Sequence, residues 1–243
     1  MGTTYKVEVS NNGGTTWVEL DSKQTLTVVE EGLDPLGLGV AWADHFNWDA
    51  AYLKVTDFGA KAGDDIDDTA AFQAALNAAG AQTGGGVVFV PNGTYLVGNF
   101  QMSAYTVLMG ESTEKTVLKY YNPNAYNGGG NMFSNTAEAE GIGQIGLANF
   151  SVRMYDDAVR PDTFLWLGHR WGTANKDQTT RTAKEMFVSG VDIEYSYAPA
   201  QQRGLGMVFL ADERVIIQNS SFVGYYCNTQ SCYVNDYSRY IGN

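Results

Sequence analysis

The sequence predicts an all-β protein, a solenoid of short parallel strands that is closed at one end by a single short α-helix. Three observations lead to this fold class. The composition, with 28 Gly, 15 Tyr and only 17% charged residues, is typical of a chain rich in strands and turns. A single segment near the start has the spacing of an amphipathic helix. After it, short apolar segments recur at intervals of roughly 20–30 residues, as the strands of stacked coils do.

The first 50 residues are predicted to form a small β-hairpin appendage or the tail of a preceding β-sandwich module. Apolar residues alternate in 5–9 and recur in 17–20, on either side of the turn sequence Asn11-Asn12-Gly13-Gly14. The stretch that connects this hairpin to the rest of the chain contains Trp42, His45, Phe46 and Trp48. We expect these aromatic residues to cover one end of a core, and the alternative is that they stack on a sugar.

The helix is predicted directly after Asp67 and Asp68. A carboxylate at this place accepts hydrogen bonds from the free N–H groups of the first turn and complements the helix dipole. Ala71, Phe72, Ala75 and Leu76 form one apolar stripe, and Gly84-Gly85-Gly86 ends the helix before a buried strand at 87–90. Asp64, Asp65, Asp67 and Asp68 do not have the spacing of an EF-hand, so capping explains them better than calcium, and no metal or cofactor is predicted.

Residues 54–119 resemble the N-terminal signature of the pectate-lyase-superfamily (pectin-lyase-like) proteins, which are right-handed parallel β-helices. The matching residues are Asp57-Phe58-Gly59-Ala60-Lys61, Asp67-Asp68-Thr69-Ala70-Ala71-Phe72-Gln73, the segment 84–90 and Pro91-Asn92-Gly93-Thr94-Tyr95. The sequence departs from the family pattern at Ala62-Gly63-Asp64, where Gly-Asp-Gly is usual. The resemblance implies that residues 51–243 are coils of such a β-helix and that the helix caps its N-terminal end. It assigns no catalytic residue, because the chemistry of the family varies and lies in later coils.

Three later segments superpose by pattern, at 145–152, 186–193 and 215–222. Asn149, Gly190 and Asn219 occupy the same place in each, which predicts either a turn or an inward polar ladder at that position. The agreement supports a coil that repeats along the chain.

A tighter repeat is found at the end of the chain, where residues 208–219 and 232–243 align without gaps at an offset of 24. This alignment makes the following pairs: Val208 with Cys232, Asp212 with Asp236, and Ile217 with Ile241. One coil earlier, residues 164–169 align with 207–212, which places His169 where Asp212 stands. Because the chain stops as a further coil begins, we expect residues 51–243 to be the N-terminal coils of a truncated β-helix.

The candidate catalytic residues are Asp212, Asp236 and His169, each of which follows an apolar strand at a turn. Equivalent positions in neighbouring coils lie roughly 4.8 Å apart, so two stacked carboxylates repel and one holds its proton more tightly. That asymmetry suits an acid paired with a nucleophile or base across a glycosidic bond. The alternative is a polar ladder that finishes each strand. The predicted substrate-binding residues are Arg170, Trp171, Arg214, Tyr237 and Arg239.

The net charge of −12 argues against a nucleic-acid partner, and no apolar run reaches membrane-spanning length. All the arginines fall in the second half of the chain, where their forked donors suit carboxylates and sugar hydroxyls: Arg153, Arg160, Arg170, Arg181, Arg203, Arg214 and Arg239. Cys227 and Cys232 bracket a short polar segment and are predicted to be either a small disulfide loop or two buried thiols.

Together these observations predict a secreted enzyme that degrades a polysaccharide in a groove along the coils. The acidic balance and the line of aspartates favour a glycoside hydrolase. The arginines support the alternative of a polysaccharide lyase that acts on a uronate polymer, because such an enzyme neutralises the uronate carboxylate before it removes a proton. A phage tailspike depolymerase and a non-catalytic carbohydrate-binding β-helix are further alternatives. The hairpin and the cysteine pair favour a secreted cellular protein. We expect a monomer, or a trimer if the protein is phage-derived.

Overall fold

The computed structural model divides the chain into two compact units, residues 1–32 and 33–243. It describes residues 33–121, 130–135, 144–155, 163–168, 185–194, 205–210, 214–223, 227–232 and 239–241, together with two short strands in the first unit. Those strands, β1 (Glu8–Val9) and β2 (Val18–Glu19), pair antiparallel, with Val9 opposite Val18. The predicted hairpin is therefore confirmed in its pairing, and the turn sequence between its strands lies outside the described residues.

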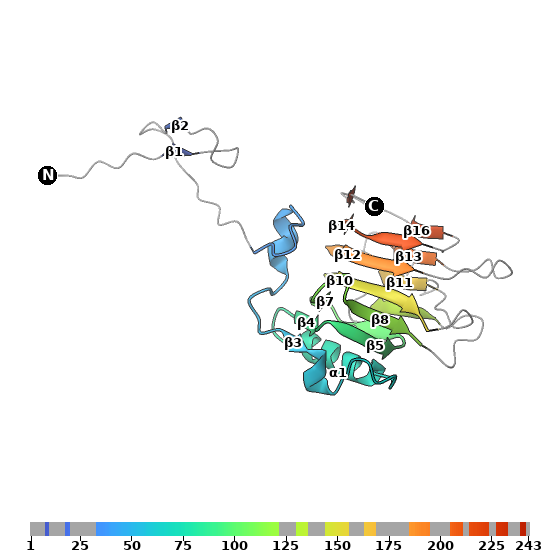
Figure 1. The fold of residues 1–243 in the computed structure, drawn as a ribbon. Coiled ribbons are helices and arrows are strands. Elements are labelled where there is room, and N and C mark those ends of the chain that lie inside the picture. Colours follow the sequence, from blue (N-terminus) through green and yellow to red (C-terminus); the bar gives the residue numbers. More distant parts are fainter. Residues whose placement is uncertain are drawn as a thin grey trace, which may run out of the picture. The chain divides into compact units, whose positions relative to one another are not determined.

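The second unit is a stack of coils, and each coil supplies strands to a ten-stranded and a five-stranded parallel sheet (Figure 1). The ten-stranded sheet contains β3 (Leu53–Lys54), β4 (Gly86–Val90), β5 (Gly93–Val97), β7 (Thr106–Gly110), β8 (Thr116–Tyr120), β10 (Ile145–Met154), β12 (Met186–Glu194), β14 (Val215–Gln218), β15 (Ser221–Val223) and β17 (Arg239–Ile241). The five-stranded sheet contains β6 (Phe100–Met102), β9 (Asn131–Asn135), β11 (Thr163–Gly168), β13 (Leu205–Leu210) and β16 (Cys227–Cys232). This arrangement confirms the predicted parallel β-helix.

The ten-stranded sheet turns a corner at the position predicted from the repeat. Asn149, Gly190 and Asn219 all have left-handed backbone conformations, with φ of 58°, 65° and 52°. They follow Ala148, Ser189 and Gln218, which pair with one another in neighbouring strands. Asparagine and glycine tolerate this conformation better than other residues, which explains why they recur here. The prediction of a repeated turn is confirmed, and it divides the sheet into a first half before the corner and a second half after it.

The interior of the stack is filled by apolar side chains that align from coil to coil. One such line in the first half of the ten-stranded sheet consists of Val88, Leu108, Leu147, Val188 and Ile217, all buried. Aromatic rings also pack in the interior: the ring centroid of Phe133 lies 5.4 Å from that of Phe100 and 5.3 Å from that of Phe164. Alignment in every coil lets each side chain pack against its equivalents above and below, so burial is continuous along the axis.

The α-helix α1 (Thr69–Gly80) lies at the N-terminal end of the stack, as predicted (Figure 1). Phe72, Ala75, Leu76 and Ala79 are fully buried, while Ala71 is only half-buried. The Phe72 ring stacks on Phe100, with centroids 5.5 Å apart and planes 18° apart. The helix therefore replaces the coil that would otherwise precede β4–β6, and its apolar stripe closes the core.

The two aspartates before α1 have different roles. Asp67 accepts a hydrogen bond from the backbone N–H of Thr69, the first residue of the helix, at 2.9 Å, whereas Asp68 at the N-cap position makes no side-chain capping bond. Asp68 instead accepts one from the N–H of Lys61 at 2.9 Å, and its second oxygen is buried with no hydrogen-bond partner in the described part of the chain. Burial raises the pKa of Asp68, and the nearby charges of Asp64 and Asp67 raise it further, against the hydrogen bond from Lys61 that lowers it.

Residues 33–48, called the strap below, belong to the solenoid unit, although the sequence assigned them to the appendage. The strap contains a short 3-10 helix (Ala41–His45), and a second one (Val55–Phe58) follows β3. Trp42, Phe46 and Trp48 are buried against the outer side of the first half of the ten-stranded sheet, not against an end of the core. This sheet carries apolar residues on both faces, Val87 outside and Val88 inside for example, so its outer face needs a cover.

The centre of the strap contact is Phe187 on β12. Its ring makes an edge-to-face contact with Phe46, with centroids 5.0 Å apart, and lies 6.0 Å from Trp48. The ring occupies the space above Gly146, where a Cβ atom would lie 2.1 Å from it. A glycine is therefore required at position 146 to admit the aromatic ring that anchors the strap.

A buried carboxylate fastens the strap to the sheet. Glu185, whose side chain is 3% exposed, lies 2.7 Å from His45 Nδ1 in the strap and 2.7 Å from the guanidinium of Arg214. It also accepts a hydrogen bond from Gln144 Nε2 at 2.7 Å. Gln144, Glu185 and Arg214 immediately precede β10, β12 and β14, so neighbouring coils place them side by side.

The offset-24 alignment at the end of the chain is wrong. Cys232 pairs with Leu210, two residues further along than predicted, and Ile241 pairs with Gln218 rather than with Ile217. In the preceding coil Leu210 pairs with Gly168, where the alignment paired it with Leu167. For the pair β14–β17 the reason is visible in β14, whose four residues are all buried because the strap covers the outer face. Such a strand lacks the alternation that reveals register.

The cysteine pair is not a loop. Cys227 and Cys232 are the first and last residues of strand β16. The predicted alternatives of a disulfide or two thiols concern side chains outside the described ones, so the bonding state of this pair stays a prediction. Within the described ranges no helix is long and apolar enough to cross a membrane.

Candidate functional site

Most of the predicted site residues lie outside the described residues: His169, Arg170, Trp171, Asp212, Asp236 and Tyr237. The strands that precede them in sequence are nevertheless placed. These strands are β11, β13 and β16, which are neighbours in the five-stranded sheet. Their last residues, Gly168, Leu210 and Cys232, pair with one another in register. In three successive coils, the strand of the five-stranded sheet therefore ends at the same level. His169, Asp212 and Asp236 follow these strand ends in sequence by one, two and four residues.

Two arginines of the predicted set are described: Arg214 immediately precedes β14, and Arg239 opens β17, both strands of the ten-stranded sheet. Arg214 forms the ion pair with Glu185 described above, and its side chain is 32% exposed. Arg239 is the first residue of β17 and pairs with Ile216. Neither belongs to a strand of the five-stranded sheet. A role for them in substrate binding stays a prediction.

A polar hollow of about 470 Å³ opens where the five-stranded sheet meets α1. Its lining comes from the helix, from β6 and the residue before it, and from β9: Gln73, Asn77, Asn99, Phe100, Gln101, Asn131 and Ser134. All of these residues are uncharged, and all but Phe100 carry an amide or a hydroxyl. Gln101 and Ser134 pair in register on β6 and β9. The hollow therefore lies on the sheet that also carries the predicted catalytic segments.

Internal hydrogen bonds fix the walls of the hollow. The side chain of Gln73 accepts from the backbone N–H of Gln101 and donates to its carbonyl, each at 2.8 Å, so α1 is clipped to β6. Asn99 accepts from the hydroxyl of Tyr120 at 2.7 Å. Phe100 is 1% exposed and lies between Phe72 and Phe133. In contrast, the side-chain amides of Gln101 and Asn131 have no hydrogen-bond partner within the part of the chain that the structure describes.

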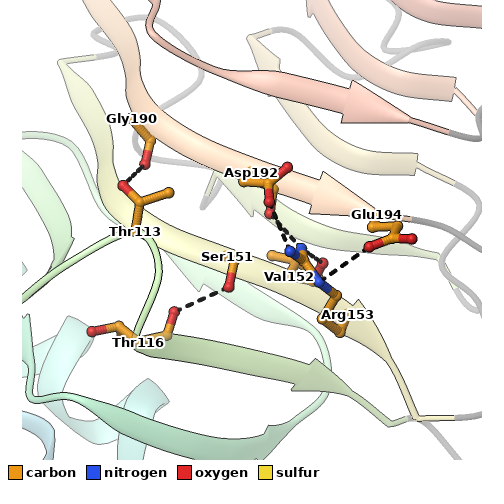
Figure 2. A network of polar contacts seen from close by, with 8 residues as sticks. All are labelled: Thr113, Thr116, Ser151, Val152, Arg153, Gly190, Asp192 and Glu194. Atoms are coloured by element: carbon orange, nitrogen blue, oxygen red, sulfur yellow. Dashed lines mark hydrogen bonds and ion pairs between the residues drawn. The ribbon is translucent and has the colours of Figure 1, made fainter.

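A second polar group lies on the second half of the ten-stranded sheet (Figure 2). Arg153 on β10 forms an ion pair with Asp192 at 2.7 Å and a longer one with Glu194 at 3.5 Å, both on β12. Below them Ser151 donates to the carbonyl of Thr116 on β8 at 3.5 Å. These contacts tie neighbouring coils together. Because the carboxylates and the guanidinium already satisfy one another, we assign this group a structural role.

Sequence reasoning missed the hollow. Its residues lie in separate segments, and each is an ordinary Asn, Gln or Ser that no motif distinguishes. One signal was present, since Gln73 stands in the helix segment that carries the family resemblance. Its partner Gln101 lies 28 residues further along, and that pairing follows only from the three-dimensional arrangement.

The fold defines the class of protein: a right-handed parallel β-helix capped by an N-terminal α-helix. Residues 52–224 match the family of rhamnogalacturonase A/epimerase, pectate lyase-like proteins, and the chain belongs to this family. The expectation drawn from the signature at 54–119 is thereby confirmed.

Known proteins with similar sequence or structure include the following. A segment of 64 residues is 41% identical to an iota-carrageenase of Alteromonas macleodii, which amounts to 26% of this chain and 13% of that protein. The mannuronan C-5 epimerase AlgE4 A-module of Azotobacter vinelandii superposes with a TM-score of 0.58 and 22% identity, over 79% of this chain and 50% of that module. A putative glycosyl hydrolase of Parabacteroides merdae superposes with a TM-score of 0.50 and 13% identity, over 79% and 96% of the two chains. The chain thus spans about half the length of the epimerase module and a small part of the carrageenase.

Proposed function

We propose that this chain belongs to the catalytic β-helix of an enzyme that cleaves a polysaccharide by hydrolysis, with the substrate lying along the outer face of the five-stranded sheet. The observation that carries the proposal is the common register of Gly168, Leu210 and Cys232 at the ends of β11, β13 and β16. Side chains contributed just after neighbouring parallel strands converge on one edge, and a polymer can bind across several coils there. Family membership and the carrageenase-like segment also support an enzyme that acts on polysaccharides.

Asp212 and Asp236 are the proposed acid and its partner carboxylate. They follow Leu210 and Cys232, two paired strand ends, by two and four residues. Hydrolysis requires two carboxyl groups at about 5–5.5 Å for retention or about 6.5–9.5 Å for inversion. His169 follows Gly168 in the preceding coil and is proposed to orient the sugar. We also propose that the enzyme acts outside the cell, where its polymeric substrate would be found.

The test replaces Asp212 and Asp236 singly by Asn in the complete gene product and measures new reducing ends on a panel of plant and algal polysaccharides. Each variant is expected to lose at least about a hundredfold in kcat, since general acid–base groups contribute about 10²–10⁴-fold. Asp49→Asn, at an exposed aspartate directly after the strap, is the matched control and should keep full turnover.

The products distinguish hydrolysis from the other reactions of this fold. An ultraviolet-absorbing unsaturated sugar would show a lyase, and a change in sugar configuration without cleavage would show an epimerase. If both Asp variants retain normal turnover on a polymer that the unaltered enzyme cleaves, the proposed catalytic pair is wrong. If the unaltered enzyme forms none of these products on any polymer, the proposal of a polysaccharide-active enzyme is overturned.

A further inference from the structure

We infer that the polar hollow between α1 and the five-stranded sheet is a binding site for an uncharged sugar unit at the end of the substrate chain. The inference rests on the proposed function for the direction of the polymer, but the binding chemistry follows from the hollow itself. Its volume of about 470 Å³ falls in the range of roughly 300–1,000 Å³ that small-molecule sites occupy.

The lining selects for hydroxyl groups and against anions. A side-chain amide both donates and accepts hydrogen bonds, as a sugar hydroxyl does. Gln101 and Asn131 can therefore each donate a hydrogen bond to one sugar hydroxyl and accept one from another. A carboxylate or sulfate in the same place would need a cation or a cluster of donors, and burying it without one is costly. The residues that line the hollow are all uncharged. A uronate or sulfated sugar is therefore disfavoured here.

The walls make the site rigid before a ligand binds. Gln73 is held by two hydrogen bonds to the backbone of Gln101, and Asn99 is held by Tyr120. Phe100, whose ring is fixed in the core between Phe72 and Phe133, anchors β6 beneath the hollow. Preorganised walls reduce the entropy lost on binding. The side-chain amides of Gln101 and Asn131 are then the groups that are left to form hydrogen bonds with a ligand.

The position of the helix implies that the site holds a chain end. The five-stranded sheet begins with β6, and α1 is joined to it through Gln73, which lines the hollow together with Asn77. A polymer that runs over successive coils therefore meets the helix when it reaches β6. In the other direction, Ser134 on β9 pairs with Trp166 on β11. The sheet therefore continues from the hollow toward the strands that precede the proposed catalytic residues.

The test is a nuclear magnetic resonance titration that follows the side-chain NH₂ signals of Gln101, Asn131 and Asn77. The probes are galactose, rhamnose and glucose, with galacturonate as the anionic counterpart of galactose. At least one neutral sugar is expected to shift these signals saturably, and galacturonate is expected to bind at least about tenfold more weakly. Equal binding of galacturonate, or no shift with any neutral sugar, would overturn the inference.

Two variants and a control locate the binding. Gln101→Ala and Asn131→Ala should each weaken the neutral sugar about fivefold to tenfold, which corresponds to the loss of one or two neutral hydrogen bonds. Gln101 is exposed, so its variant tests the site without disturbing the fold. Thr94→Ala removes an exposed hydroxyl from the ten-stranded sheet and should leave affinity unchanged. Because the readout is binding without turnover, it succeeds or fails independently of the proposed hydrolysis. Unchanged affinity in both amide variants would place the sugar elsewhere and refute the site.

Discussion

Asp67 and Asp68 are neighbours whose carboxylates have opposite energetic consequences for folding. Asp67 accepts a hydrogen bond from Thr69 at the first turn of α1, where a negative charge also complements the helix dipole. Asp68 is 5% exposed and has one oxygen without a hydrogen-bond partner among the described residues. A buried carboxylate of this kind is better accommodated when it is protonated, which is why burial raises its pKa.

We predict that Asp68→Asn stabilises the protein at neutral pH. Since the pKa of Asp68 is higher in the folded state than its ordinary value of 3.8, folding favours the protonated form. The stability that Asp68 contributes is therefore complete below that value and is lost as pH rises through the folded-state pKa. Asparagine keeps an acceptor for Lys61 and does not ionise. Thermal unfolding should show a higher Tm for the variant at pH 7 and no difference near pH 3.

The neighbouring position supplies the control for this prediction. Asp67→Ala removes the cap and should lower the free energy of unfolding by about 1 kcal/mol at pH 7. A variant Asp68→Asn that is less stable than the natural protein at pH 7 would show that the ionised carboxylate contributes favourable contacts that outweigh its burial.

At the scale of the element, α1 closes the end of the core. We predict that Phe72→Ala costs about 3–5 kcal/mol, because it removes a fully buried ring that contacts both Phe100 and Tyr95. Ile66, which lies just before the helix and is 64% exposed, is the matched control, and Ile66→Ala should be nearly neutral. Chemical denaturation of the two variants measures both effects. A small effect of Phe72→Ala would mean that the helix does not seal the stack.

At the scale of the whole molecule, the structure places the boundary between the two units at residue 32, before the strap. The strap buries Trp42, Phe46 and Trp48 against the sheet and is fastened through Glu185. Its removal would expose Val87, Val107, Phe187 and Ile216 to water. An exposed apolar face of that kind promotes aggregation.

We therefore predict that a protein beginning at Leu33 keeps the thermal stability of the solenoid, whereas one beginning at Ala51 loses several kcal/mol and aggregates. Thermal unfolding, binding of a hydrophobic dye and light scattering of the two shortened proteins check this directly. Equal stability and solubility would show that the strap is not part of the folded unit.

The sequence by itself determined the class of fold, the helix and its cap, and the repeated corner at Asn149, Gly190 and Asn219. These features are local: a carboxylate before a helix, an apolar stripe, or a residue that tolerates a left-handed backbone is recognisable without its distant partners. The tertiary structure alone decided the register of β13 with β16 and of β14 with β17, the place of the strap, and the hollow. The register of β14 with β17 was hidden because β14 is buried on both faces and so shows no alternation. The strap and the hollow depend on contacts such as His45 with Glu185 and Gln73 with Gln101, which join segments far apart in the chain.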